Sequence, residues 1–169
     1  DGDVSYSIST DASNGSATVS GSVITYTPDT NYNGTDSFYW QFADANTTSL
    51  TYLVNVTVSA VNDAPIISTI PDQTINEDEQ FETLSLDDYV SDIEDADQDI
   101  TWTYSGHNDL TLTLTDRVLV ITNSANWNGA ETITFTATDS GGLTATDNVL
   151  FIVNAVNDVP EITIPDQTI

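Results

Sequence analysis

A junction that occurs twice constrains this chain more than any other sequence feature. Residues 60–65 read Ala-Val-Asn-Asp-Ala-Pro, and residues 155–160, 95 positions later, read Ala-Val-Asn-Asp-Val-Pro. Each copy ends an alternating apolar run, and each is followed within a few residues by Ile-Pro-Asp-Gln-Thr-Ile. Recurrence at a fixed period is typical of a tandem array of structural units. The sequence therefore predicts modules that are joined at these two points.

Further matches set the limits of the units. Asn126–Gly129 (Asn-Trp-Asn-Gly) matches Asn31–Gly34 (Asn-Tyr-Asn-Gly) at the same offset, whereas Trp102 matches Tyr6 one position out of phase. The matches divide the chain into an incomplete unit without its front strands, a complete unit, and the first strand of a third: residues 1–63, 64–158 and 159–169. In the complete unit, the front is expected to hold strands at 66–70 and 81–86.

Alternating apolar and polar residues predict short β-strands throughout. Val4, Tyr6 and Ile8 alternate with polar residues, which is the period of a strand with one buried face. Val149, Phe151 and Val153 match Val54, Val56 and Val58 at the 95-residue offset, so the same kind of strand is expected in both units. Turn signals such as Asn-Gly break the runs. The predicted fold class is all-β, with the strands packed as β-sandwiches.

The charge of the chain limits its partners. Its 169 residues include 27 Asp and Glu but only one basic residue, Arg117. Nucleic acids and anionic membrane surfaces bind basic patches, so neither is expected as a partner. No segment approaches the roughly 20 apolar residues of a membrane span, so direct membrane insertion is not expected either. Bound cations or a salty medium must offset the self-repulsion of so many carboxylates.

The acidic run Ser91–Asp99 is the strongest candidate for binding such a cation. It holds five carboxylates: Asp92, Glu94, Asp95, Asp97 and Asp99. Ca²⁺ prefers six to eight oxygen ligands, whereas zinc needs nitrogen or sulfur donors that a chain with one His and no Cys scarcely offers. The run is not an EF-hand, because its sixth position from Asp95 is Ile100 rather than glycine.

At the end of a sandwich, this loop is expected to lie near Asn62 and Asp63 of the first junction and near Asp139. An ion held there would restrain two units joined by a short linker, whose relative motion is otherwise the default. The alternative is a solvated acidic loop that binds no ion.

The motifs resemble those of bacterial cadherin-like tandem repeats, which build the stalks of large surface adhesins. The resemblance is carried by Asn-(Tyr/Trp)-Asn-Gly, by Ala137-Thr138-Asp139, by Asp95-Ala96-Asp97, and by the Val-Asn-Asp-(Ala/Val)-Pro junctions. It implies Greek-key sandwiches of cadherin or immunoglobulin type, extracellular display on a cell surface or in secreted form, and Ca²⁺ at the junctions. It also implies that one residue of the second acidic group, Glu77, Asp78 and Glu79, lies at the opposite end of the complete unit, near Asn157 and Asp158.

The sequence departs from the cadherin pattern in one motif. The Leu-Asp-Arg-Glu segment of cadherins has no counterpart, because Asn126-Trp127-Asn128 stands in its place. One or two ions per junction are therefore expected instead of three. The full set of predicted metal ligands is Asn62, Asp63, Asp92, Glu94, Asp95, Asp97 and Asp139, with Glu77 and Asp158 at the other end.

Little in the sequence indicates catalysis. His107 is the only histidine and lies in a predicted turn without a nucleophile beside it. Trp40, Trp102 and Trp127 match core positions of the repeat and are expected to be buried. The predicted function is therefore non-catalytic: a calcium-stiffened structural or adhesive module, whose partners are neighbouring repeats, copies of itself, or a protein or glycan receptor.

Two alternatives stay open at this point. The tail, residues 161–169, could be donated as a strand to the incomplete first unit of another copy, which would give a head-to-tail filament. The chain could instead be a carbohydrate-binding module, which would show aromatic side chains exposed in a row.

Overall fold

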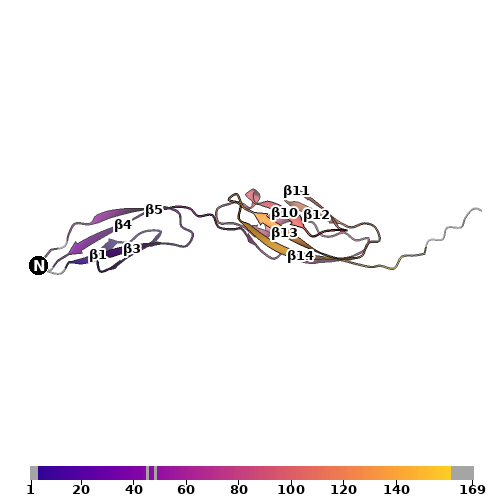
Figure 1. Ribbon diagram of the computed structural model, residues 1–169, viewed down its shortest axis with the longest axis horizontal. Coiled ribbons are helices and arrows are strands. Elements are labelled where there is room, and N and C mark those ends of the chain that lie inside the picture. Colours follow the sequence, from indigo (N-terminus) through magenta and orange to yellow (C-terminus); the bar gives the residue numbers. More distant parts are fainter. Residues whose placement is uncertain (1–3, 45, 48, 161–169) are drawn as a thin grey trace, which may run out of the picture. The chain divides into compact units, whose positions relative to one another are not determined.

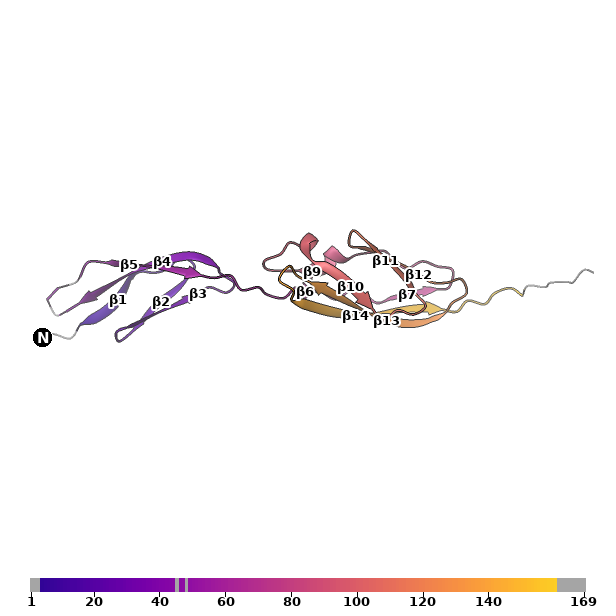
Figure 2. The ribbon, with the colours of Figure 1, turned by 45° about the horizontal axis from the view of Figure 1, so that its top comes forward.

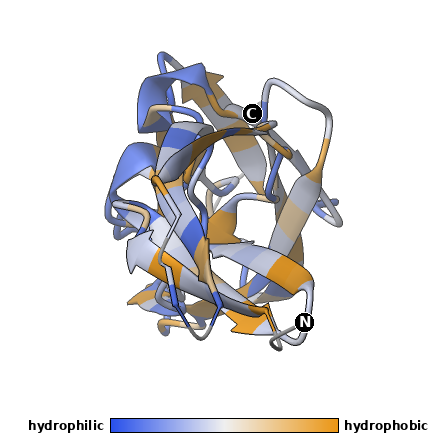
Figure 3. Cartoon of the chain, turned by 90° about the vertical axis from the view of Figure 1, so that its left-hand side faces the viewer, coloured by the Kyte–Doolittle hydropathy of each residue, from blue (hydrophilic) through white to orange (hydrophobic). Residues whose placement is uncertain are grey.

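The computed structural model describes residues 4–44, 46–47 and 49–160, and the chain forms two compact units, Asp1–Val61 and Asn62–Ile169. Both units are built from β-strands, in agreement with the predicted class (Figures 1 and 2). Apolar and polar positions alternate along the strands, as Figure 3 shows by its colours. This alternation is what gives each sheet one apolar face.

The first unit has a sheet and a hairpin. The strands are β1 (Ser5–Thr10), β2 (Gly15–Ser20), β3 (Val23–Pro28), β4 (Gly34–Ala43) and β5 (Tyr52–Val58). The sheet has the order β1-β4-β5 and is antiparallel, and β2 pairs with β3. The hairpin packs on the sheet through Tyr26, whose ring is stacked at 6.3 Å on the ring of Phe38.

The second unit contains the same elements with a front segment before them. That segment holds β6 (Ile66–Ile67), β7 (Gln73–Asn76), β8 (Leu84–Ser85), the 3-10 helix η1 (Leu86–Tyr89) and β9 (Val90–Ser91). The 3-10 helix η2 (Asp97–Asp99) follows, and then β10 (Thr101–Ser105), β11 (Thr111–Thr115), β12 (Val118–Thr122), β13 (Gly129–Thr138) and β14 (Thr144–Asn154). Its sheets have the orders β10-β13-β14-β7, β11-β12-β8 and β6-β9.

The front strands are shorter than the sequence predicts. The predicted strand at 66–70 is reduced to β6, because the backbone N–H of Ile70 donates to the Asp147 carboxylate at 2.9 Å instead of joining a ladder. The predicted strand at 81–86 is reduced to β8, and Leu86 begins the 3-10 helix η1. In these two places, a side-chain acceptor and a 3-10 turn replace the hydrogen bonds of a strand ladder. The alternation of apolar and polar residues in the sequence reveals neither feature.

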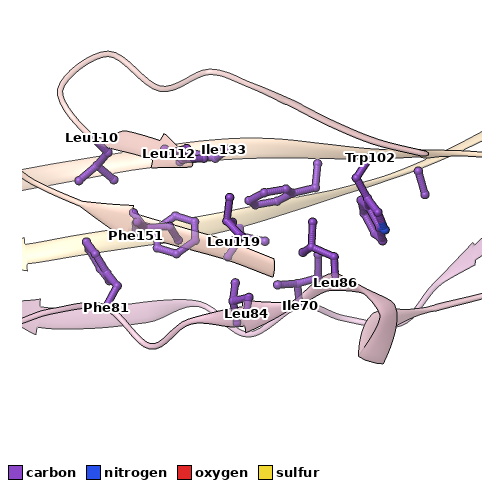
Figure 4. Packing of buried hydrophobic residues seen from close by; sticks show 14 of the residues in the cluster. Ile70, Phe81, Leu84, Leu86, Trp102, Leu110, Leu112, Leu119, Ile133 and Phe151 are labelled. Carbon is purple, nitrogen blue, oxygen red and sulfur yellow. The ribbon is translucent and has the colours of Figure 1, made fainter. Parts of the chain in front are cut away.

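The core of the second unit lies between the front segment and the sheets behind it. In Figure 4, Ile70, Phe81, Leu84 and Leu86 face Phe151, Leu119 and Trp102 across the core. Ile70 is 1% exposed, and Phe135 and Phe151 are fully buried. Burying side chains of this size stabilises a fold by about 1.5–3 kcal/mol each.

The predicted opening strand of a third unit falls mainly on residues 161–169, which lie outside the described residues. None of the helices in the described part of the chain is long and apolar enough to cross a membrane.

Candidate metal centre at the first junction

Asn62 fixes the beginning of the second unit to the turn after β13. Its Nδ2 donates a hydrogen bond to Oδ2 of Asp139 at 2.8 Å and a second to the carbonyl oxygen of Asp63 at 3.2 Å. Asp139 directly follows β13 and is buried, with 6% of its surface exposed. The junction residue is therefore held by a carboxylate that lies 77 positions away in the sequence.

The environment of Asp139 keeps its carboxylate ionised. Burial alone would raise the pKa of this carboxyl, because an apolar surrounding disfavours the charged form. Hydrogen bonds from Asn62 and from the backbone N–H groups of Leu143, Gly142 and Gly141 outweigh burial and lower the pKa below its usual value of 3.8. The Leu143 N–H donates to Oδ1 at 2.8 Å. The site therefore holds a buried negative charge at neutral pH.

Gly141 leaves the space that the Asn62 side chain occupies. A Cβ atom at position 141 would lie 2.5 Å from Cγ and from Oδ1 of Asn62, closer than non-bonded carbon and oxygen atoms approach. Only glycine therefore allows Asn62 to reach Asp139 in this conformation.

The acidic loop lies against the same junction. Oε2 of Glu94 accepts the backbone N–H of Asp63 at 3.1 Å. Both oxygens of Asp95 accept from Ser140, Oδ2 from the backbone N–H at 2.7 Å and Oδ1 from the hydroxyl at 2.9 Å. The loop thus contacts both the junction and the turn that follows Asp139, as the sequence predicts.

Asp92 organises the loop and leaves one oxygen free. Its Oδ1 accepts the N–H groups of Glu94 at 2.8 Å and of Asp95 at 3.0 Å, which closes a tight turn. Its Oδ2 is buried and has no hydrogen-bond partner within the described residues. A buried carboxylate oxygen without a partner carries a desolvation cost of several kcal/mol unless a cation or a donor satisfies it.

These residues fit Ca²⁺ by chemistry, although their side chains do not already converge on one point. The donors are carboxylate, amide and carbonyl oxygens, which are the ligands that Ca²⁺ takes. Within the part of the chain that the structure describes, no group of three or more His, Cys, Asp or Glu residues is arranged to hold a metal ion. The oxygens of Asp95 and Asp139 accept protein hydrogen bonds, so ion binding would require some of these bonds to be exchanged.

The remaining predicted ligands lie elsewhere. Asp97 begins η2, adjacent to the loop, and its side chain is exposed. Glu77 and Asp158 lie at the other end of the unit: Glu77 is 5% exposed, accepts the backbone N–H of Val156 on its carboxylate, and donates its own N–H to Asn154 at 2.9 Å. One contact of the first junction recurs at Asp158, whose carbonyl accepts from Asn157 Nδ2 at 3.2 Å as that of Asp63 does from Asn62.

Two contributors to the site were not identified from the sequence. Ser140 supplies two hydrogen bonds to Asp95, and Gly141 supplies the space for Asn62. Both belong to the run Asp-Ser-Gly-Gly at 139–142, of which only Asp139 is among the predicted ligands. A small residue two positions after a buried aspartate is the signal that could have indicated close packing there.

The aromatic residues divide between core and surface. Trp102 is buried at 6% exposure, as predicted, and Trp127 is half-buried against the core. Trp40 is half-buried as well, so burial is complete for Trp102 and partial for the other two tryptophans. His107 is exposed in its turn, with its ring 5.3 Å from that of Tyr104.

Two immunoglobulin-like units, with an acidic loop packed on the junction, define the class of tandem Ig-like or cadherin-like repeat proteins. The bacterial Ig domain model matches residues 1–57 and 62–152. The chain therefore belongs to the bacterial Ig domain family, whose domains are typically extracellular and generally non-catalytic.

Solved cadherin structures share the fold. Domains EC1-2 of human mucin-like protocadherin align with a TM-score of 0.53 at 15% identity, over 90% of this chain and 85% of that one. Domains 1–4 of protocadherin gamma B7 align with a TM-score of 0.55 at 18% identity, over 91% and 42%. The PcdhgB3 EC1-4 structure aligns with a TM-score of 0.59 at 16% identity, over 91% of this chain and 41% of that one. The chain therefore spans about two fifths of the length of these two four-domain fragments. No curated protein matches the chain.

Proposed function

We propose that the chain is a structural or adhesive module of an extracellular repeat protein, and that Ca²⁺ at the first junction stiffens it. The observation that carries the proposal is the contact of Asn62 and Asp63 with two acidic segments, at Asp139 and at Glu94. Asn62 directly follows Val61, the last residue of the first unit. Restraining Asn62 and Asp63 therefore restrains the point at which the two units are joined.

Ca²⁺, when bound, would supply a charge that satisfies several oxygens at once. Asp92 would hold it through its partnerless Oδ2, Glu94 and Asp95 through their carboxylates, and Asn62 through its side-chain oxygen. Asp63 and Asp97 are the further candidates, and Asp139 would keep Asn62 in place. Glu77 and Asp158 would form the corresponding site at the second junction. The net charge of −26 supports a need for cations of this kind.

The test compares thermal unfolding in millimolar CaCl₂, in MgCl₂ of equal ionic strength, and in EGTA. A ligand at 100 times its Kd stabilises the folded state by about 2.7 kcal/mol, so Ca²⁺ should raise the Tm of the wild type beyond the rise that Mg²⁺ gives. Asp92→Asn should remove the difference. Asp88→Asn is the matched control, because it removes the same charge from an exposed residue of η1. Equal shifts with both cations would reject the proposal and indicate charge screening.

Stiffening needs its own measurement. The chain has no cysteine, so spin labels can be placed at Thr25→Cys on β3 and Thr113→Cys on β11, both exposed. The distance distribution between the two labels should narrow when CaCl₂ replaces EGTA. An unchanged width would reject stiffening even if the ion binds.

A further inference from the structure

The strand β10 of the second unit has one free edge. Its other edge pairs with β13 over the whole of Thr101–Ser105, and within the described residues no strand pairs with the free edge. β10 is an internal strand of this unit, between η2 and β11. A free edge exposes a row of backbone N–H and carbonyl groups that can pair with a further strand.

This edge lacks the features that prevent such pairing. Natural sheets protect their free edges with charged side chains, proline or β-bulges. β10 has none of these, because it reads Thr-Trp-Thr-Tyr-Ser and its register with β13 runs from Thr101 to Ser105 without a shift. The equivalent strand of the first unit, β1, does contain a register shift, between Ile8 and Thr10. β10 therefore presents a regular edge to which a strand can be added.

The sheet face beside the free edge is uncharged. Thr101, Thr103 and Ser105 alternate with the inward-facing residues of β10 and are exposed. Their neighbours across the sheet are Thr138, Thr136 and Thr134 of β13, followed by Thr144, Thr146 and Asn148 of β14. The chain carries 27 acidic residues, so a second copy that approaches here avoids the carboxylates that repel it elsewhere.

The two ends of β10 are complementary to each other. Asp99 lies two positions before the strand, His107 lies two positions after it, and both are exposed. The ion pair found among the described residues joins Arg117 to Asp87, so neither Asp99 nor His107 takes part in it. If β10 pairs with its own copy in antiparallel orientation about Thr103, residue 101 lies opposite 105 and residue 99 opposite 107. A carboxylate, which accepts hydrogen bonds, then lies beside an imidazole N–H at each end of the ladder.

We propose that the free edge of β10 binds a second copy of the chain, which adds its own β10 in antiparallel orientation. Thr103 then lies opposite Thr103 of the second copy, on a two-fold axis, so the contact is isologous and closes after two copies. The two four-stranded sheets become one continuous sheet. Only one short strand edge is buried in each copy, which is less than a standard interface, so association is weak and needs a high protein concentration.

Charge sets the conditions under which this contact forms. Each copy has a net charge of −26, so two copies repel each other at low ionic strength. At about 0.15 M salt, exposed charges more than about 8 Å apart are largely screened, whereas groups in direct contact are screened less. Association should therefore need moderate NaCl, and it should not need Ca²⁺.

The first experiment locates the contact by disulfide trapping in EDTA and moderate NaCl. Thr103→Cys supplies the single cysteine of the chain, and the Cα atoms of opposite residues in antiparallel strands, about 4.5–5.5 Å apart, lie within disulfide range. The control is Thr146→Cys, which is exposed on the same sheet face but on the interior strand β14. Thr103→Cys should form a disulfide-linked dimer several-fold faster. Equal rates, or faster trapping at position 146, would overturn the proposal.

The register is tested with two variants in one mixture. Thr101→Cys and Ser105→Cys are combined under mild oxidation, and the links are quantified by mass spectrometry of the digested product. Antiparallel pairing about Thr103 predicts that the 101–105 link exceeds the 101–101 and 105–105 links. A statistical distribution of the three links would overturn this register.

The pairing of Asp99 with His107 is tested in the Thr103→Cys background. His107→Glu places two carboxylates together at each end of the ladder and should slow dimer formation several-fold. Adding Asp99→Lys should restore the rate. Adding Asp88→Lys instead makes the same change of charge at an exposed residue of η1 and should not restore it. Equal recovery by both would overturn the pairing and indicate an effect of net charge.

The unmodified chain provides the last test. Amide hydrogen exchange in EDTA, measured by mass spectrometry at low and high protein concentration, should show added protection at high concentration in the peptide that covers Thr101–Ser105. Exchange that is independent of concentration there would overturn the proposal. Because Ca²⁺ is absent from all these experiments, their failure is separate from that of the calcium proposal.

Discussion

Asp36 and Glu131 occupy the same position of the repeat, and each carboxylate holds the loop that follows the first sheet strand of its unit. Asp36 accepts the backbone N–H groups of Ser13 at 3.1 Å and Asn14 at 2.9 Å. Glu131 accepts those of Asn108, Asp109 and Leu110, the shortest at 2.7 Å from Asp109. Both acids are 8% exposed. The repeat thus keeps an internal acceptor for its loop although the side chain differs in length.

Replacing Glu131 by alanine should destabilise the second unit. The N–H groups of the exposed residues Asn108 and Asp109 can bind water instead, but Leu110 is 2% exposed and its N–H would be left without a partner. One unsatisfied buried donor costs about 1–3 kcal/mol. Denaturant unfolding should show a loss in this range for Glu131→Ala and almost none for the control Glu82→Ala, which removes an exposed carboxylate. Equal losses would contradict an acceptor role for Glu131.

Tyr26 should make the first unit sensitive to alkali. Burial and the hydrogen bond that its hydroxyl donates to Asp36 at 2.9 Å raise the pKa of Tyr26 from 10.0 to about 12. The folded state therefore holds this proton more tightly than the unfolded state. Its contribution to stability is complete below pH 10 and is lost as the pH rises from 10 through 12.

The comparison with Tyr26→Phe isolates this contribution. The stability difference between wild type and Tyr26→Phe should shrink across pH 10–12, and the phenolate absorbance of the wild type should contain one late-titrating group that the variant lacks. Tyr39→Phe, at an exposed residue, is the control and should leave the late group in place. If the wild type and Tyr26→Phe lost stability in parallel across pH 10–12, the raised pKa could not be assigned to Tyr26.

The phase shift between the two copies has a structural cause that the sequence shows only as a mismatch. Tyr6 pairs with Phe42, and Trp102 pairs with Ala137, which are equivalent pairs. Between Ile8 and Thr10 the register of β1 shifts, so that Ser9 is an extra residue in the strand. In a β-bulge, two residues of one strand are opposite one residue of the other, so one extra residue is accommodated and pairing continues on both sides. The alternation of apolar and polar residues therefore predicted both β1 and β10, but not the bulge in β1 that explains why the two copies are one residue out of phase.

The candidate site was predictable to a similar degree. The clustered acids and the repeated junction predicted that the acidic loop would lie near Asn62 and Asp63, and the hydrogen bond from the Asp63 N–H to Glu94 shows this contact. The roles of Ser140 and Gly141 depend on the backbone geometry after β13. Neither the alternation of apolar and polar residues nor the clustering of acidic residues indicates that geometry. The half-burial of Trp40 could not be predicted from its own strand, because the burial of a strand's apolar face depends on segments that are far away in the sequence.

Asn62 should control the ionisation of Asp139. In the wild type the pKa of Asp139 lies below 3.8, so its contribution to stability is complete above that value and is lost as the pH falls through the lowered pKa. Asn62→Ala removes one of the hydrogen bonds that oppose burial, and the pKa should rise. Carboxyl ¹³C chemical shifts measured during an acid titration would report the change. The internal control is Asp44, whose pKa is lowered by hydrogen bonds from Asn46 and Thr47 and should not change in the variant.

Gly141→Ala should displace Asn62 without removing any polar group from the site. The added Cβ would lie 2.5 Å from Asn62 Cγ, so either the side chain or the turn must move. Because position 141 is not in the left-handed region, alanine adds this clash but no backbone strain. In the wild type we expect the hydrogen bonds donated by Asn62 Nδ2 to protect this side-chain amide from exchange with water. In the variant the amide should exchange faster in NMR exchange spectra, and Ca²⁺ affinity should fall relative to the wild type. Ser140→Ala is the comparison, since it removes one hydrogen bond from Asp95 and leaves the space around Asn62 intact. A variant that kept both the protected amide and the wild-type affinity would show that Asn62 does not depend on Gly141, and that the junction is fixed by Glu94 alone.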